Sequence, residues 1–425
     1  MSEKNKEILP DWINGCFIEN SLKKCWKFEK SFKIINYDAT TAAPFGEHCG
    51  SQLFRINIKY FSKDEIKETS IIVKIIPEGQ IGDFLRSVPV FETEGKTLGK
   101  VLPVVYEFLK KGYPNEEKRW PDCYYDQGPP KNIIIMEDLK LKEFKMADRF
   151  EGLDYEHSSL VVECLAKLHG TSIVMLMDEK NFKENFENYT FVFWREKNKE
   201  ICKTLFDDTI KFLGEDMKTW PEFDKKQYFI EKLTKLDILG KTLAAWKNVD
   251  DNELKSLIHG DCWINNIMFK YDDTSVKKPT QMKFLDFQLT TIHSPIMDLI
   301  HFIFTSTKHD SKLLMMDDLL EKYHVTLLET FKKLHPDGGD AAVHLKNFYH
   351  IKDLKEKFKE KLFWGFAVLC SFVPFMFTPV DEILSPDEFL YGTDNREYKK
   401  KIFSNGKVRK MIVENLHYFH NNDVI

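Results

Sequence analysis

The feature that most constrains this chain is a polar octapeptide set among apolar segments in its second half. The octapeptide, HGDCWINN, contains Asp261 and ends at Asn266. Two short strand-like pieces follow at residues 267–270 and 282–285, and a turn with Asp and Pro residues connects them. Asp286 comes directly after the second piece, 25 residues beyond Asp261. Two carboxylates and one amide therefore flank a pair of predicted short strands.

These residue types match the needs of phosphoryl transfer from ATP. Such a transfer requires a carboxylate that orients the acceptor hydroxyl and takes its proton, oxygen ligands for Mg²⁺, and positive charge on the phosphates. Asp261 supplies the first carboxylate, and Asn266 follows at the five-residue spacing of the kinase catalytic loop H-R-D-x-x-x-x-N. Asp286 stands where a second carboxylate for the metal belongs. The sequence therefore predicts Asp261 as catalytic and Asn266 and Asp286 as Mg²⁺ ligands.

The first third of the chain is β-rich and the remainder is mostly helical. Apolar or alternating runs predict strands at residues 53–60, 70–76, 104–109 and 132–136. Gly, Pro and charged residues predict connections at residues 77–89 and 111–131. Helices are predicted at residues 91–101, 158–177, within 181–255 and from 298 onward. A β-rich lobe followed by a helical lobe is a two-lobed α+β arrangement, with the boundary near residue 139.

Charge and composition exclude several kinds of partner. The formal net charge is −5, and no run of Lys and Arg indicates a nucleic-acid or membrane surface. The most apolar run, residues 362–377, is shorter than the ~20 residues of a membrane span and contains Gly365 and Pro374, so we expect a buried helix. The eight cysteines form no Cys-x-x-Cys pair, and residues 1–10 carry no apolar signal segment. We therefore expect free thiols and a cytoplasmic protein without a membrane span.

The octapeptide and the triplet DFQ at residues 286–288 resemble the motifs of the insect ecdysteroid kinase-like family, within the superfamily of choline kinases and aminoglycoside phosphotransferases. The resemblance extends from residues 9–12 to the Phe-rich helix near the C-terminus. It implies a protein-kinase-like fold. Residues 1–139 would form a nucleotide-binding lobe that ends in a hinge, and residues 140–425 a helical lobe with the catalytic loop, the metal site and the acceptor pocket.

The resemblance also assigns residues of the first lobe to ATP. Lys74, at the end of the run IIVK, is similar to the strand lysine that pairs with phosphates. Glu94 is similar to the helical glutamate that pairs with this lysine, and Glu92 is the alternative. Taken singly, a lysine at a strand edge and glutamates on a helix face are ordinary solvated residues, so these assignments rest on the motifs as a set.

Two further segments resemble parts of a nucleotide site. Gly46, Gly50 and Ser51 occupy the position of a turn over the phosphates, which backbone N–H groups would bind. An ordinary hairpin turn is the alternative. The hinge, whose backbone would bind adenine, resembles the segment that contains Met136, Glu137 and Leu139. The carboxylates of this segment are alternatively plain loop polar groups.

Two residues are expected to support the site, and two more are expected to be packed. The resemblance implies that His259 is a scaffold of the catalytic loop and that Asp298 braces this loop. His169 matches another motif of the family and is expected to be packed. Trp263 is expected in the core, with the border of the acceptor site as the alternative.

The leading hypothesis is an ATP- and Mg²⁺-dependent kinase of a lipophilic alcohol, an ecdysteroid or a related steroid or xenobiotic, with detoxification as a role. The alternatives are a choline- or aminoglycoside-type kinase of a cationic metabolite, and a non-catalytic pseudokinase that binds a ligand. The aromatic residues within 362–377 predict an aromatic, largely uncharged acceptor pocket in the helical lobe, although a buried helix has the same composition. The acceptor, the hydroxyl that is phosphorylated and the oligomeric state stay open.

Overall fold

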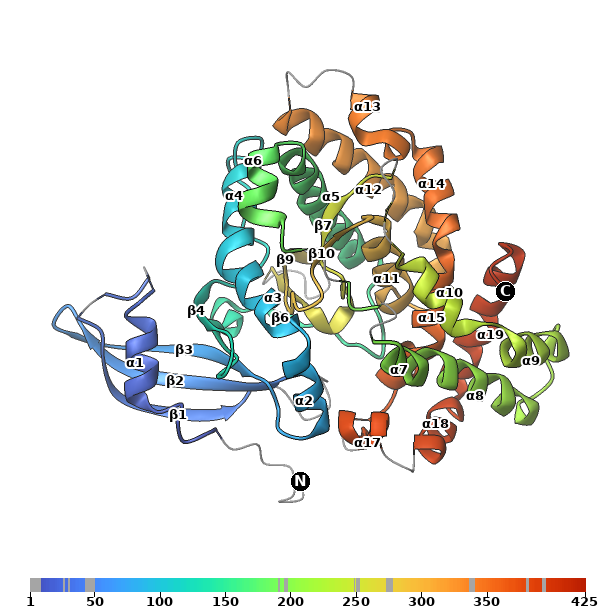
Figure 1. The fold of residues 1–425 in the computed structure, drawn as a ribbon, viewed down its shortest axis with the longest axis horizontal. Coiled ribbons are helices and arrows are strands. Elements are labelled where there is room, and N and C mark those ends of the chain that lie inside the picture. The colour runs from blue at the N-terminus through green and yellow to red at the C-terminus, as the bar shows by residue number, and fades with distance from the viewer. Residues whose placement is uncertain are drawn as a thin grey trace.

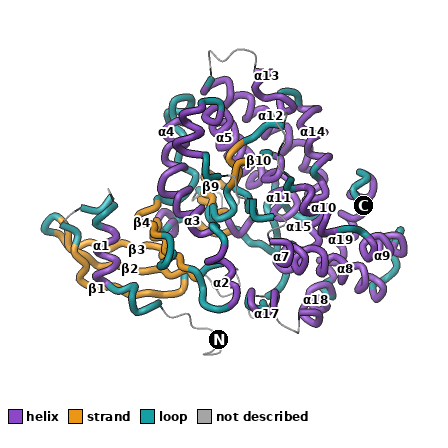
Figure 2. The backbone as a smooth tube through the Cα atoms, viewed as in Figure 1, coloured by secondary structure: helices purple, strands orange, loops and turns teal. Residues whose placement is uncertain are grey.

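The computed structural model describes residues 9–25, 27–29, 31–42, 50–189, 192–194, 198–247, 249, 253–272, 278–335, 341–379, 382–391 and 395–425. Over these residues the chain forms a sheet-containing lobe and a larger helical lobe (Figure 1). The long strands gather at one side of the molecule, and helices fill the other (Figure 2). The predicted two-lobed α+β class is therefore confirmed.

The first lobe is built on a five-stranded antiparallel sheet. Its strands are β1 Lys33–Thr41, β2 Gln52–Ser62, β3 Glu65–Ile75, β4 Cys123–Gln127 and β5 Ile133–Glu137. The spatial order is β1-β2-β3-β5-β4, so the chain leaves the sheet after β3 and returns to its edge as β4. The strands predicted at residues 53–60, 70–76 and 132–136 are confirmed as β2, β3 and β5.

Apolar alternation gives this sheet a buried face. In β2 the buried residues Phe54, Ile56 and Ile58 alternate with more exposed ones. Helix α1 (Gly15–Leu22) packs with them in a small apolar cluster. Strand β5 is buried throughout, because its residues divide between this cluster and the large core of the molecule.

Three helices connect β3 to β4. They are α2 Gln80–Ser87, α3 Val90–Lys96 and α4 Leu102–Leu109, with a π-helical turn Thr97–Val101 between the last two. The helix predicted at residues 91–101 is confirmed. The strand predicted at residues 104–109 is wrong, because these residues belong to α4. Leu102, Val105 and Leu109 are buried, and their spacing of three and four residues places them on one helix face.

Two segments that were predicted as connections contain regular structure. Residues 77–89 include α2, and residues 111–131 include the edge strand β4. Strand β4 is half-exposed, and its register shifts between Cys123 and Tyr125. A short, irregular edge strand has no apolar alternation, so the sequence pattern did not indicate it.

The helical lobe is arranged around one long helix, α5, Tyr155–Leu176, which confirms the helix predicted at residues 158–177. The other helices are α6 Glu179–Asn181, α7 Lys199–Cys202, α8 Asp208–Asp216, α9 Lys226–Lys235, α10 Ile238–Ala245, α11 Ile296–Ser306, α12 Lys312–Leu334, α13 Ala341–Leu345, α14 Ile351–Glu360, α15 Leu362–Ser371, α16 Val373–Met376, α17 Pro386–Tyr391, α18 Asn395–Phe403 and α19 Gly406–Asn421. Short 3₁₀ or π segments are Leu139–Lys142, Phe182–Phe186, Lys203–Asp207, Met217–Thr219, Ile264–Asn266 and Lys346–Phe348.

Small antiparallel strands carry the polar octapeptide within this lobe. They are β6 Lys145–Met146, β7 Ser256–Ile258, β8 Ile267–Tyr271, β9 Pro279–Phe284 and β10 Thr291–His293. β6, β8 and β9 form one sheet, and β7 pairs with β10. The two strand-like pieces predicted at residues 267–270 and 282–285 are thus confirmed as the hairpin β8–β9.

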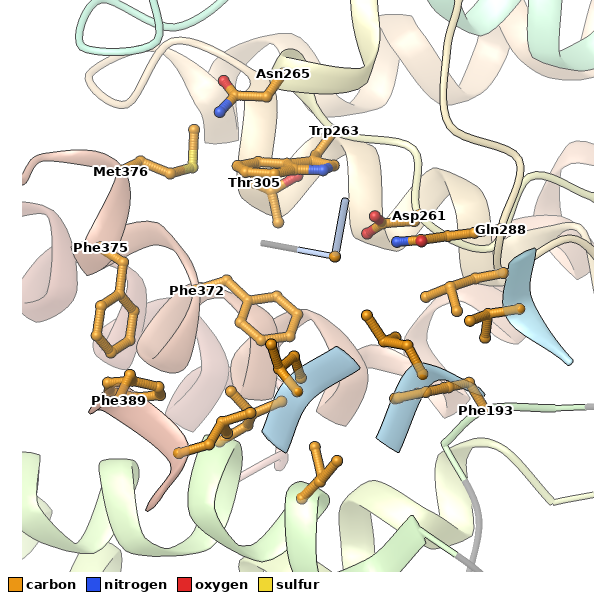
Figure 3. A pocket seen from close by; sticks show the side chains of 18 of the residues that line it. Phe193, Asp261, Trp263, Asn265, Gln288, Thr305, Phe372, Phe375, Met376 and Phe389 are labelled. Carbon is orange, nitrogen blue, oxygen red and sulfur yellow. The ribbon is translucent and has the colours of Figure 1, made fainter. Parts of the chain in front are cut away.

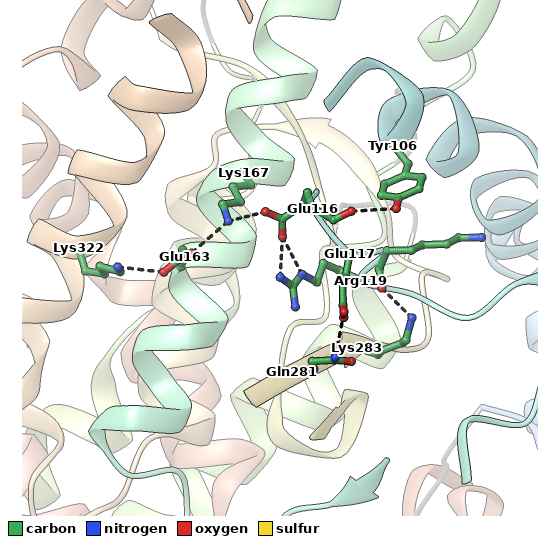
Figure 4. A network of polar contacts seen from close by, with 10 residues as sticks. Tyr106, Glu116, Glu117, Arg119, Glu163, Lys167, Gln281, Lys283 and Lys322 are labelled. Carbon is green, nitrogen blue, oxygen red and sulfur yellow. Dashed lines mark hydrogen bonds and ion pairs between the residues drawn. The ribbon is translucent and has the colours of Figure 1, made fainter. Parts of the chain in front are cut away.

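A polar network holds the segment after α4 against the helical lobe (Figure 4). Glu116 accepts hydrogen bonds from Arg119 at 3.0 Å and from Lys167 of α5 at 2.6 Å. Lys167 also lies 3.1 Å from Glu163, which pairs with Lys322 of α12 at 2.9 Å. The helices between β3 and β4 are therefore attached to the helical lobe as well as to the sheet.

The apolar run at residues 362–377 forms two short buried helices, α15 and α16, as expected for a core segment. Within the described part of the chain, α5 is the one helix that is long and apolar enough, by length and composition, to cross a membrane. Most of α5 is buried inside the protein, with 72% of its most apolar window covered. A buried core helix can match a membrane span in length and composition, so these two properties alone are weak evidence for a span.

Candidate active site

The octapeptide lies between β7 and β8, and one buried carboxylate holds its backbone. Asp298 of α11 accepts hydrogen bonds from the N–H groups of His259 at 2.7 Å and Gly260 at 2.8 Å. His169 of α5 lies 3.1 Å from the same carboxylate. Gly260 has a φ of +83°, and a Cβ there would lie 2.2 Å from the Leu289 carbonyl oxygen, so the turn requires glycine.

The two titratable groups that hold the octapeptide respond differently to burial. Burial raises the pKa of Asp298, but hydrogen bonds and the neighbouring histidines outweigh it and hold that pKa below its ordinary value. Burial lowers the pKa of His259, whose Nε2 lies 2.8 Å from the Leu285 carbonyl oxygen. The structure thus brings together His259 and Asp298, for which we predict a supporting role, and His169, which we expect to be packed.

Asp261 projects from the octapeptide with a neighbour on each carboxylate oxygen. Asn266 donates to its Oδ2 at 3.1 Å and to its backbone carbonyl at 2.9 Å. His301 of α11 places Nε2 3.5 Å from Oδ1. Burial, followed by the charge of Asp286, raises the pKa of Asp261 to about 8, whereas burial lowers the pKa of His301 to about 3. Asp261 is therefore a more basic carboxylate than an ordinary aspartate, beside a neutral imidazole.

Asp286 and Asn266 stand at the same end of the hairpin β8–β9. The Leu285 N–H donates to the Asn266 carbonyl oxygen at 2.8 Å, which extends the strand pairing to the last residue before Asp286. Asp286 has a φ of +59°, in the left-handed region that non-glycine residues seldom adopt. Such strained positions cluster at functional sites, because the surrounding structure has to hold them.

Lys74 of β3 connects the sheet to this end of the hairpin. Its Nζ lies 2.6 Å from Glu94 of α3 and 2.9 Å from Asp286. Burial lowers the pKa of Lys74, but the charges of Asp286 and Glu94 outweigh burial and raise it above its ordinary value. Of the two glutamates considered from the sequence, Glu94 contacts the lysine, whereas Glu92 is partly exposed and lies 3.6 Å from Lys96.

A cavity of about 480 Å³, called here the hinge cavity, lies between the sheet and the hairpin β8–β9. Leu53 and Ile72 line it from the sheet, and Met268 and Leu285 line it from the hairpin side. Lys74, Glu94, Asn266 and Asp286 also line it. Apolar walls that face one another, with charged groups at one end, suit a flat heteroaromatic ring that carries phosphates.

The three predicted hinge residues, Met136, Glu137 and Leu139, line the hinge cavity. The Glu137 carboxylate pairs with Lys142 and lies 3.9 Å from Lys27. The side chain of Glu137 is therefore engaged with lysines, and the role predicted for this segment is one for its backbone.

The predicted phosphate turn is described only in part. Gly46 lies outside the described residues, whereas Gly50 and Ser51 precede β2 and lie within them. A Cβ on Gly50 would lie 3.3 Å from Gln288 Oε1, so this glycine approaches the residue that follows Asp286 and Phe287. Ser51 is buried. A phosphate-binding role for the turn stays a prediction.

A second cavity, of about 290 Å³, is called here the aromatic cavity. Asp261 and Gln288 point toward its interior, and Phe372, Phe375 and Phe389 lie on the side opposite (Figure 3). Most of the lining is apolar, in agreement with the predicted composition of the acceptor pocket. The Asp261 carboxylate thus faces a largely aromatic space.

The aromatic cavity is not confined to the helical lobe. Ile81 and Phe84 of α2 and Val90 of α3 also line it, so elements on both sides of the predicted boundary build this cavity. Trp263 is half-buried and lines it too, and a place at the border of an acceptor site stays a prediction for this residue.

Sequence reasoning missed several residues at these cavities. The segments that supply Phe84, Phe193 and Phe389 carried no motif. His301 stood in a predicted helix, and Arg149 stood in a segment for which the sequence predicted no element. Apolar residues at helical spacing in residues 81–90 were the one available signal, and the Gly and Pro residues around them obscured it.

Comparison with known proteins gives one family match over most of the chain. The model of the Ecdysteroid kinase-like family matches residues 45–336, a range that includes Lys74, Asp261 and Asp286 but not the aromatic residues 372–389 of the second cavity. The search of curated proteins found no match.

Several solved structures of small-molecule kinases are similar to this chain at low identity. A choline kinase from Cryptosporidium parvum Iowa II is 13% identical, covers 93% of this chain and 98% of its own, and has a TM-score of 0.38. A choline/ethanolamine kinase family protein from Mesorhizobium loti is 10% identical, covers 82% and 98%, and has a TM-score of 0.33. An aminoglycoside phosphotransferase from Streptomyces rimosus is 13% identical, covers 75% and 92%, and has a TM-score of 0.32.

Proposed function

Because this chain belongs to the ecdysteroid kinase-like family, we propose that it transfers the γ-phosphate of ATP to a hydroxyl group of a lipophilic alcohol. The acceptor that we propose is an ecdysteroid or a related steroid or xenobiotic alcohol. One observation carries the proposal. Asp261 lines the aromatic cavity and contacts Asn266, while Asn266 and Asp286 line the hinge cavity. In this proposal a base and a metal site lie where the hinge cavity, which would hold the nucleotide, meets the apolar aromatic cavity.

In the proposed reaction the acceptor hydroxyl hydrogen-bonds to Asp261 and gives up its proton to this carboxylate. The hydroxyl oxygen bonds to the γ-phosphorus, the bond from phosphorus to the bridging oxygen breaks, and ADP leaves with the electron pair. The raised pKa of Asp261 suits a group that has to accept a proton near neutral pH. Asn266 orients this carboxylate, and the Glu94 contact holds Lys74 in place for the phosphates.

Asn266 and Asp286 fit a Mg²⁺ ion by the chemistry of their donor atoms. The Asn266 amide N–H donates to Asp261, so its amide oxygen is the atom that would face the metal beside the Asp286 carboxylate. In the described residues no group of three or more His, Cys, Asp or Glu side chains could hold a metal by itself. A site with only two protein ligands is consistent with Mg²⁺, because this ion binds through one or two protein ligands, substrate phosphates and water. When bound, the ion would neutralise charge on the phosphates.

The aromatic cavity supports an apolar acceptor over a polycation. Among the described residues, Arg149 and Asp261 are the charged ones in its lining, so these residues provide no acidic excess of the kind that an aminoglycoside with several ammonium groups would require. Rings from α15 to α17 and from α2 offer flat apolar contact instead. Burial of apolar surface contributes roughly 25 cal/mol per Å², so a steroid nucleus gains affinity from its whole area.

The proposal is tested by transfer of labelled phosphate from ATP to a panel of an ecdysteroid, choline and an aminoglycoside. We expect the highest kcat/KM with the ecdysteroid, and a KM for it that changes little with salt, since burial of apolar surface is not screened. The Asp261→Asn variant is the control for contaminating kinases. Turnover of choline or the aminoglycoside without turnover of any steroid would contradict the proposed acceptor class and leave the kinase assignment in place. A chain that binds ATP and phosphorylates none of them would favour the non-catalytic alternative.

Choline is the second candidate acceptor, because an aromatic lining with one carboxylate also recognises a quaternary ammonium ion. Trp263, Phe372 and Asp261 provide these groups in the aromatic cavity. Choline turnover should weaken as salt rises, because its charge pairs with the carboxylate. The salt dependence of KM therefore separates the two acceptors.

A cytoplasmic location of the protein stays a prediction.

A further inference from the structure

Two residues, Arg149 and Asn265, line both the hinge cavity and the aromatic cavity. Asp261 lines the aromatic cavity alone, whereas Lys74 and Asp286 line the hinge cavity alone. A phosphoryl group that moves from a nucleotide in one cavity to an alcohol in the other has to pass the boundary that Arg149 and Asn265 share. Asn265 lies at the edge of the aromatic cavity, beyond Trp263 (Figure 3).

The contacts of Arg149 hold its guanidinium in place. Arg149 is 9% exposed, donates from Nη2 to the Thr378 carbonyl oxygen at 3.0 Å, and lies 4.8 Å from the centre of the Phe150 ring. The preceding residue, Asp148, accepts a hydrogen bond from the Phe150 N–H at 2.8 Å, so its carboxylate closes a local turn. A fixed guanidinium needs little reorganisation when charge develops beside it.

Two further cations line the hinge cavity from the sheet. Arg55 lies 2.7 Å from Asp138, and Lys74 lies between Glu94 and Asp286. Both belong to strands of the sheet, on the nucleotide side of the site. In phosphoryl transfer, negative charge spreads over the three equatorial oxygens of the transferred group, and a cation at that position stabilises the transition state.

We propose that Arg149 is a catalytic residue, whose guanidinium binds oxygens of the γ-phosphate as this group crosses from the hinge cavity to the aromatic cavity. The planar fork of arginine suits two phosphate oxygens at once. The proposal rests on the proposed function, since it takes the nucleotide to occupy the hinge cavity. Arg149 would then add a third positive charge, beside those of Lys74 and the metal, at the position where the nucleotide and the alcohol meet.

The test uses two nucleotides that differ in the group that Arg149 is proposed to bind. Calorimetric titration of the full chain with Mg·ADP and with the non-hydrolysable analogue Mg·AMP-PNP is compared for wild type, Arg149→Gln and Arg149→Lys. Arg149→Gln should weaken AMP-PNP binding roughly tenfold to hundredfold, the usual contribution of hydrogen bonds to a charged group, and leave ADP binding unchanged. Arg149→Lys keeps the positive charge but not the planar fork, so its affinity for AMP-PNP should lie between those of the wild type and Arg149→Gln.

Arg409→Gln is the matched control, because Arg409 also donates to a backbone carbonyl, that of Phe403 at 2.7 Å, and lies over an aromatic ring, Trp220, while lining neither cavity. It should bind both nucleotides as wild type does. Equal losses for ADP and AMP-PNP in Arg149→Gln, or no loss for either, would overturn the proposal and indicate a structural arginine. If Arg149→Gln does not fold, Arg149→Lys decides by the same comparison. A wild-type chain that binds neither nucleotide would instead overturn the proposed function, and this proposal with it.

Discussion

Asp261 illustrates how single residues set the chemistry of this site. Its carboxylate is held between an amide donor, Asn266, and a buried imidazole, His301, within a backbone turn that Asp298 fixes. These neighbours come from two elements, the 3₁₀ segment Ile264–Asn266 and helix α11, and all act on one side chain. Removal of the charge from Asp261 is therefore the most direct test of its role.

We predict that Asp261→Asn lowers kcat for the acceptor identified by the panel by about 10²–10⁴, the usual cost of losing a general base. The affinity for Mg·ADP should persist, because Asp261 does not line the hinge cavity. Steady-state kinetics and calorimetry of the same preparation check both parts. An Asn variant with kcat near that of wild type would refute the assignment of the base.

We expect Lys312 to affect the stability of the fold and not the chemistry of the candidate active site. It is fully buried at the start of α12, and its Nζ donates to the Phe304 carbonyl at 2.7 Å, in the last turn of α11. Burial lowers its pKa from 10.5 to about 7. The unfolded chain thus holds a proton that the folded protein releases between these values, so the stability of the fold should rise with pH over this window.

Lys312→Met should flatten this pH dependence, because methionine has similar length and no charge. Thermal unfolding measured at intervals from pH 7 to pH 10 checks the slope, whatever the absolute change in Tm. Lys352→Met is the control, since Lys352 is well exposed. A slope that is unchanged in Lys312→Met would show that this lysine stays protonated in the folded protein across the range.

At the scale of elements, a close helix contact in the core joins α15 to α11. Gly365 of α15 lies so near Phe304 of α11 that a Cβ on it would stand 2.5 Å from the ring. Both residues are buried, and Ile300 lies 3.1 Å from the same position. The absence of a side chain at Gly365 therefore permits the close approach of the two helices.

We predict that Gly365→Ala destabilises the fold by about 1–3 kcal/mol, because the added methyl overpacks the contact. Denaturant unfolding measures the change. Gly406→Ala is a matched control at the start of α19, where a Cβ would meet no atom within 4 Å. There the same substitution should stabilise by roughly 0.4–1 kcal/mol, since alanine restricts the unfolded chain. Equal effects at both positions would contradict the close-packing argument.

At the scale of the whole molecule, the two lobes share the hinge cavity. Lys74 comes from the sheet, and Asp286 follows the hairpin of the helical lobe, so their 2.9 Å contact joins the two lobes. The network around Glu116 attaches the helices between β3 and β4 to the same helical lobe. A ligand that bridges Lys74 and Asp286 should therefore stabilise both lobes together.

We predict that Mg·ADP raises the Tm of the wild type, by an amount that corresponds to about 2.7 kcal/mol at a nucleotide concentration of one hundred times Kd. Asp286→Asn and Asp286→Ala should lose the part of this shift that depends on Mg²⁺. The Asn variant is the better test, because asparagine tolerates the positive φ at this position more readily than alanine does. A shift that still depends on Mg²⁺ in both variants would place the metal elsewhere.

The sequence by itself determined the class of the fold and which polar residues come together at the candidate site. Asp261, Asn266 and Asp286 are close in the chain, and a short hairpin between them leaves few ways to arrange their side chains, so spacing alone predicts the cluster. Long apolar runs likewise predicted β2, β3, β5 and α5, because their burial pattern repeats along one element.

The tertiary structure decided what no local pattern contains. Residues 104–109 are β-branched and aromatic in part, yet the core that receives Leu102, Val105 and Leu109 makes them helical. The phase of α3 turns Glu94, and not Glu92, toward Lys74. The aromatic cavity and the place of Arg149 between two cavities depend on side chains from segments far apart in sequence. Such contacts arise from packing, which depends on the whole chain at once, whereas spacing constrains only neighbours along it.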